Sequence, residues 1–101
     1  MNNSLTPTEG ARFLLEREHD GGASARYRAA IYTPDATYEG HAVLHDDGAV
    51  ELDVAGAPDE LIATLQMLAK LTARSAPRKR EDGLPPWPAR VLRWRGPGRG
   101  E

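Results

Sequence analysis

The feature that most constrains the fold is a run of four short segments in which apolar and polar residues alternate. These segments span residues 11–18, 25–33, 37–45 and 49–55, and turn signals separate each from the next. Alternation with a period of two places the apolar side chains on one face of a strand. The pattern therefore predicts a four-stranded antiparallel β-meander with one apolar face and one polar face.

The lengths of the loops between these segments predict the strand register. Residues 46–48, Asp-Asp-Gly, suit a three-residue loop closed by a glycine in the left-handed region. A four-residue loop at 33–36 and a three-residue loop at 20–22 keep apolar residues opposite apolar residues. The predicted opposite pairs are Leu44 with Val50, Ala42 with Leu52, Ile31 with Tyr38, Tyr27 with Ala42, Leu15 with Tyr27, and Phe13 with Ala29.

The first segment has an alternative interpretation as a helix. Residues 6–9, Thr-Pro-Thr-Glu, resemble a capping box with proline at the first helical position, which would start a helix running to about His19. Gly10 weakens such a helix, and residues 8–18 pair better as a strand. The strand is the preferred prediction.

The same register pairs charged residues on the polar face. It places Glu16 opposite Arg26, and His41 between Arg28 and Asp53. We expect a solvated surface here rather than an active site.

The two histidines of the third segment do not predict a metal site. His41 and His45 are four residues apart, which is a metal-binding spacing on a helix but roughly 13 Å on a strand. The acidic residues of the neighbouring turn and strand lack the spacing of a calcium loop. Those residues are Asp46, Asp47, Glu51 and Asp53. No metal and no cofactor are expected.

After Gly56 the apolar period changes to that of a helix. Residues 58–60, Pro-Asp-Glu, start this helix, and it is expected to run to about Arg74. The small residues Ala25, Ala29, Gly40 and Ala42 on the sheet would let the helix pack closely. The overall prediction is an α+β fold with one helix on the meander. The predicted buried face consists of Leu61, Ile62, Leu65, Leu68, Ala69 and Thr72.

A second apolar stripe on this helix needs a cover of its own. It consists of Ala63, Met67 and Leu71, and one sheet cannot cover both stripes. Either the C-terminal residues return and place Leu92 and Trp94 there, or a second copy packs helix against helix about a two-fold axis. The first cover is preferred because the C-terminal residues supply apolar bulk and complementary charge.

The charge of the chain is divided unevenly. Residues 1–73 carry five basic and twelve acidic side chains, whereas residues 74–101 carry eight basic and three acidic ones. This division predicts an acidic domain at 1–74 and a basic tail at 75–101, which could dock on the domain. Residues 75–88 are expected to form a linker, with an extended Pro85–Pro88 segment. Residues 89–95 alternate again and could form a short fifth strand at a sheet edge.

Nothing in the sequence predicts an enzyme. The chain contains no phosphate loop and no GxGxxG, GxSxG or HExxH motif. The absence of cysteine excludes thiolate chemistry and suits the cytoplasm, and no membrane span is expected. We therefore expect a small non-enzymatic protein-interaction or accessory module, with a homodimer as one arrangement. The alternative is a nucleic-acid-binding accessory protein that acts through its basic tail. The candidate partner-binding residues in the tail are Arg90, Leu92, Arg93, Trp94 and Arg95.

Overall fold

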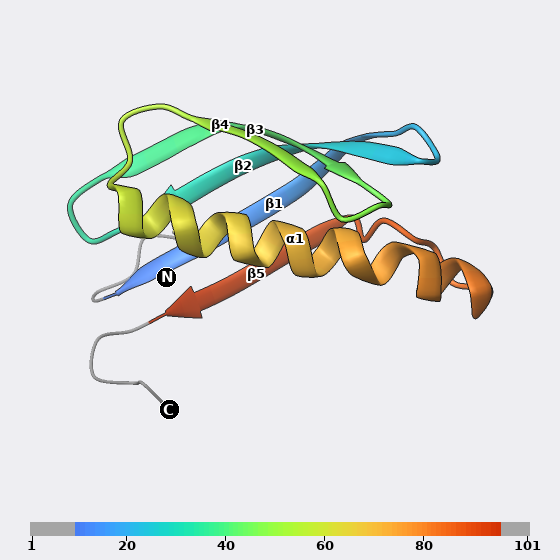
Figure 1. The fold of residues 1–101 in the computed structure, drawn as a ribbon. Helices are drawn as coiled ribbons and strands as arrows, with labels where there is room; N and C mark the ends of the chain where they lie inside the picture. Colours follow the sequence, from blue (N-terminus) through green and yellow to red (C-terminus); the bar gives the residue numbers. More distant parts are fainter. Residues whose placement is uncertain (1–9, 96–101) are drawn as a thin grey trace.

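Residues 10–95, the part of the chain that the computed structural model describes, form one antiparallel sheet of five strands and one long helix (Figure 1). The predicted α+β fold is confirmed, including the fifth strand. The strand order is β4-β3-β2-β1-β5. The elements are β1 (Ala11–Asp20), β2 (Ser24–Tyr32), β3 (Thr37–His45), β4 (Val50–Val54), α1 (Asp59–Glu81) and β5 (Arg90–Arg95).

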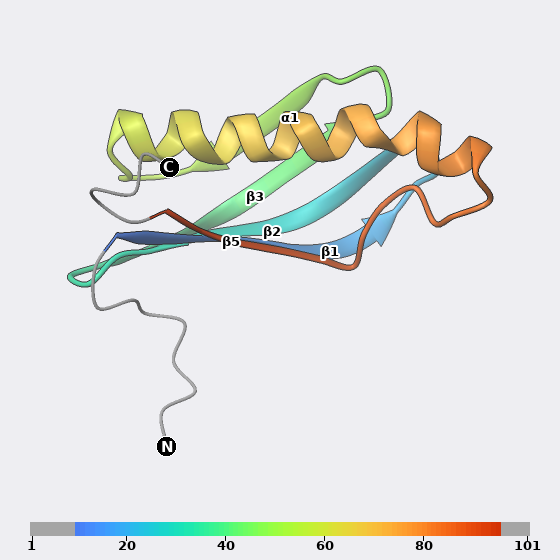
Figure 2. The same ribbon diagram turned by 90° about the horizontal axis from the view of Figure 1, so that it is seen from below.

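The helix crosses one face of the sheet, and no other helix or strand of residues 10–95 covers the opposite face, here called the open face (Figure 2). β4 and β5 lie at opposite edges, and the chain of antiparallel pairings makes them run in the same direction. The connection between them is α1, which therefore has to pass over the sheet. Residues 11–18 belong to β1, so the helix alternative for the first segment is wrong. The capping-box residues 6–9 lie outside the described part.

The predicted register is confirmed for β2, β3 and β4 but wrong for β1. Leu44 lies opposite Val50, and Ile31 lies opposite Tyr38. Four residues, 21–24, separate the paired Asp20 and Ala25 instead of the predicted three. A β-bulge between Arg17 and His19 then offsets part of this change. The net slip of two residues keeps the apolar side chains on the same face. Leu15 lies opposite Ala29, Phe13 opposite Ile31, and Glu16 opposite Arg28.

The core lies between the sheet and α1. Leu65, Leu68 and Ala69 are buried on the helix, as predicted, and Ala73 and Ala76 extend the buried face. Thr72 is half-buried. The largest fully buried side chains of the core cluster are Trp87, Tyr27, Phe13, Leu15, Ile31, Leu44 and Leu65.

The sequence suggested that the small size of Gly40 lets the helix pack closely, but the structure requires glycine here because of the neighbouring strand. A Cβ atom at this position would collide with the backbone carbonyl of Asp53 on β4. The close neighbour is therefore the adjacent strand, whereas the sequence had suggested the helix. No residue larger than glycine fits here without displacing β4.

The helix extends to Glu81, so its predicted end at Arg74 and the linker assigned to 75–81 are wrong. Pro77 lies inside the helix, where it removes one backbone hydrogen bond. Burial of Ala76 and two contacts of Arg80 hold this last part in place. The Arg80 guanidinium donates to the Gly22 carbonyl at 2.8 Å and to the Asp46 carboxylate at 3.2 Å. The predicted domain boundary at residue 74 therefore falls within α1.

The segment after the helix is held by Trp87, which is 0% exposed. Its indole Nε1–H donates to the Gly22 carbonyl at 2.8 Å, and its own carbonyl accepts from Arg17 Nη1 at 2.6 Å. The Tyr27 hydroxyl donates to the Pro88 carbonyl at 2.7 Å, and burial raises the pKa of Tyr27 to about 12. These bonds join residues 87–88 to β1, β2 and the turn between them.

Candidate interaction surface

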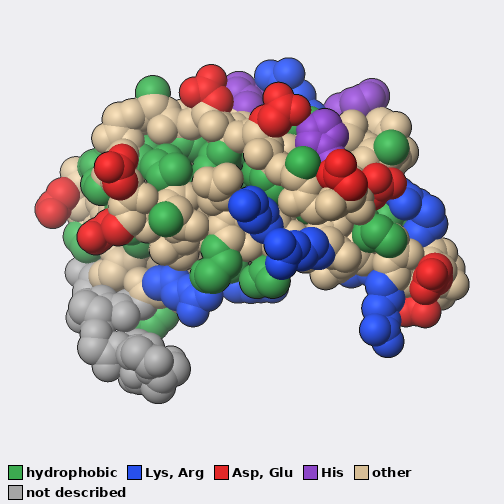
Figure 3. All heavy atoms as spheres, viewed as in Figure 1, with side chains coloured by type: hydrophobic (Ala, Val, Ile, Leu, Met, Phe, Trp, Pro, Cys, Tyr) green, Lys and Arg blue, Asp and Glu red, His purple; other side chains and the backbone are tan. Residues whose placement is uncertain are grey.

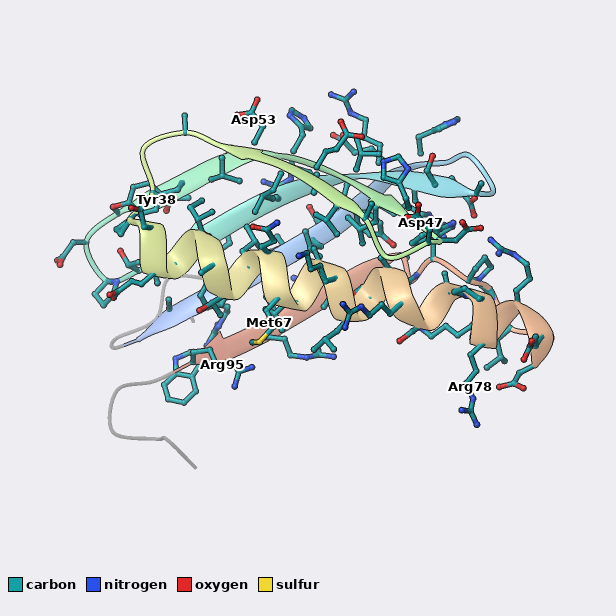
Figure 4. The ribbon with its side chains drawn as sticks, viewed as in Figure 1. Tyr38, Asp47, Asp53, Met67, Arg78 and Arg95 are labelled. Carbon is teal, nitrogen blue, oxygen red and sulfur yellow. The ribbon has the colours of Figure 1, made fainter. Side chains whose placement is uncertain are left out.

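The second stripe of α1 is exposed. Met67 is 46% exposed and Leu71 is 54% exposed, and Ala63 is exposed beside them. Large apolar side chains on one side of a helix are typical of a contact surface. Figure 4 shows Met67 and Arg78 projecting from the same side of α1.

The predicted cover by the tail is wrong. Residues 90–95 pair with β1 at the sheet edge, where Leu92 lies opposite Leu14 and Trp94 opposite Arg12. Opposite residues in a sheet share a face, and Leu14 alternates with Phe13, which is in the core beneath the helix. Leu92 and Trp94 therefore lie on the face of the sheet that α1 does not cover.

The other tail residues are divided between the two faces. Arg93 and Arg95 lie opposite Phe13 and Ala11, on the face that carries α1, whereas Arg90 lies opposite Glu16 on the open face. The five tail residues chosen from the sequence thus do not form one patch. Residues 96–101 lie outside the described part of the chain.

Basic side chains from α1 itself surround the exposed stripe. A shallow depression is lined by Ala63, Gln66, Met67, Lys70, Leu71 and Arg74. A second depression begins at Leu71 and reaches Arg78 and Lys79, and a third joins Leu71 to Val91 and Arg93 of β5. Figure 3 shows hydrophobic and basic side chains next to each other on this face. Lys70, Arg74 and Arg78 follow Met67 at helical spacing, and basic residues were expected in the last turn of the helix, but their position beside the exposed stripe required the structure.

The charges beside the stripe have no partners within residues 10–95. Lys70, Arg74, Arg78 and Lys79 form no ion pair there, and neither does Glu60 in the first turn. Arg80, by contrast, is bound to Asp46. The unpaired charges are therefore available to a partner.

Ion pairs join several of the charged residues on the open face of the sheet. Arg28 binds Glu16 at 2.7 Å, and this hydrogen bond raises the pKa of Arg28. Glu18, at the β-bulge, lies 3.3 Å from Arg26 and 3.6 Å from His41. His45 contacts Glu51 at 2.8 Å. His41 lies opposite Arg28 and Asp53 as predicted.

No group of three or more His, Asp or Glu residues among those described could hold a metal ion. Within the same residues, no helix is long and apolar enough to cross a membrane. Comparison with family models, curated proteins and solved structures gave no match. Function is therefore inferred from the exposed surface of α1.

Proposed function

We propose that this protein is a small non-enzymatic protein-interaction module whose contact surface is the exposed side of α1. The observation that supports this proposal is the pair Met67 and Leu71, about half exposed and bordered by charges that form no ion pair within residues 10–95. An apolar centre surrounded by a charged rim is the usual composition of a protein–protein interface. The cytoplasmic location expected from the absence of cysteine is part of the proposal.

The experiment is affinity capture from the native host with a tagged full-length chain. The test variant is Leu71→Glu, and the matched control is Leu84→Glu, because Leu71 and Leu84 are 54% and 55% exposed. We expect a protein bound to the wild type and to the control, retained at high salt and lost from Leu71→Glu. Equal capture by all three proteins would refute the proposed surface.

A nucleic-acid-binding function is the second candidate, favoured by Lys70, Arg74, Arg78 and Lys79, which form no ion pair with any described residue. Phosphate binding weakens steeply with salt, whereas apolar association weakens little. If the surface binds nucleic acid, Arg74→Ala should reduce the slope of log affinity against log salt by about one. The acidic first 73 residues oppose this function, because they repel a phosphate backbone.

A further inference from the structure

The charges at the two ends of the exposed stripe are opposite in sign. Its residues are spaced four, three, four, three and four positions apart, which is the spacing of a coiled-coil seam. The first is acidic, the middle two are apolar and the last two are basic. In this wider sense the stripe keeps Met67 and Leu71, leaves out Ala63 and extends in both directions along α1. It consists of Glu60, Thr64, Met67, Leu71, Arg74 and Arg78.

We propose that a second copy of this chain packs antiparallel against this stripe about a two-fold axis. The proposal rests on the proposed function, because it names the partner of the same surface. In the symmetric register, Met67 lies opposite the second copy's Leu71, and Thr64 lies opposite the second copy's Arg74. Glu60 then lies opposite the second copy's Arg78, and each contact occurs twice.

The charges at the two ends of the stripe favour an antiparallel over a parallel pair of helices. A parallel pair of helices would place Glu60 opposite Glu60 and Arg78 opposite Arg78, and like charges repel. The antiparallel pair joins opposite charges that have no ion-pair partner within residues 10–95. It also places the acidic first turn of one helix beside the basic last turn of the other.

The stripe is accessible to a second helix. Glu60, Met67, Leu71, Arg74 and Arg78 are all exposed, while the residues that contact the sheet lie on the other side of α1. At 100° per residue, the stripe lies about 150° from the centre of the buried face. A second copy can therefore approach the stripe from the side away from the core, where it would also meet Arg93 and Arg95 at the β5 edge.

Lys70 is the residue that opposes self-association. It lies next to the midpoint between Met67 and Leu71, so the two-fold axis brings two copies of Lys70 near each other. The same charge would favour an acidic partner. Neutralising Lys70 therefore distinguishes the two kinds of partner: it should strengthen binding to a second copy and weaken binding to an acidic protein.

The test is sedimentation equilibrium of the full chain, whose single-copy mass is 11.0 kDa. We expect an apparent mass that rises with concentration toward two copies. Glu60→Arg and Arg78→Glu should each raise the dimer Kd about tenfold, because each turns two attractions into two repulsions. Their equimolar mixture should regain wild-type association, because each repulsion becomes an attraction in the mixed pair. Asp35→Arg carries the same charge change as Glu60→Arg in an exposed turn and should have no effect.

Lys70→Gln should lower the dimer Kd, and a raised Kd would overturn the proposal. Single charge variants that associate like the wild type would also overturn it, as would a mixture no tighter than its components. A chain that remains monomeric yet captures another protein through Leu71 would refute self-pairing and leave the proposed function standing. Capture unaffected by Leu71→Glu would refute the proposed function itself.

Discussion

Replacing Trp87 should destabilise the whole domain. Its side chain is fully buried in the core cluster, and its indole N–H donates to the Gly22 carbonyl. Trp87→Ala removes the largest of the fully buried side chains, a change that costs about 3–5 kcal/mol in other cores. Arg80 still donates to the same carbonyl, so this oxygen keeps a partner. Trp87→Phe should cost about 1–2 kcal/mol, because it loses the hydrogen bond and some volume.

Thermal unfolding followed by circular dichroism measures this effect. At 4–8 °C per kcal/mol for a domain of this size, Trp87→Ala should lower Tm by at least about 12 °C. Trp94→Ala is the control, because Trp94 is 39% exposed on an edge strand and should cost less than half as much. If Trp87→Ala melts within a few degrees of the wild type, residues 82–95 do not form one unit with the sheet.

Two further predictions concern the sheet. Gly40→Ala should lower the urea midpoint by an amount equivalent to about 1–3 kcal/mol, because the added Cβ collides with the Asp53 backbone; an unchanged midpoint would contradict this close approach. The pKa of Tyr27 is about 12 in the folded protein and about 10 when unfolded, so the stability it contributes is complete below pH 10 and lost as pH rises to 12. Tyr27→Phe should remove that part of the alkaline decline in unfolding free energy, and an identical decline in both proteins would show that Tyr27 does not cause it.

The register of β2, β3 and β4 could be predicted because the residues of the two turns between these strands indicate how long each loop is. The Asp46–Gly48 turn and the 33–36 turn each allow one pairing that keeps apolar residues opposite one another. The β1 register was missed because of two irregularities, a longer loop and a bulge at Glu18 that offsets only part of it, which together leave a slip of two residues. A slip of two residues leaves the alternation unchanged, so periodicity cannot detect it.

The end of α1 was mispredicted because Pro77 and the surrounding charges resemble a linker. Local propensity was overridden by tertiary contacts of Ala76 and Arg80. The strand predicted from the alternation of Leu92 and Trp94 was correct. The face of the sheet that these two side chains occupy, however, depends on pairing with β1, seventy or more residues earlier in the chain. The exposed stripe at Met67 and Leu71 was visible in the sequence from helical spacing, whereas its lack of cover required the structure.

The measurement that most directly tests the proposed contact surface is disulfide trapping across the two copies. The chain has no cysteine, so single substitutions report on single positions. Met67→Cys and Leu71→Cys are oxidised alone and as an equimolar mixture, since a disulfide requires Cα atoms within about 7 Å. The antiparallel register predicts that the mixed Met67→Cys/Leu71→Cys disulfide exceeds each homodimer by far more than the twofold excess that random pairing of an equimolar mixture gives. Trapping in the random 1:2:1 proportions, or no trapping, would contradict it.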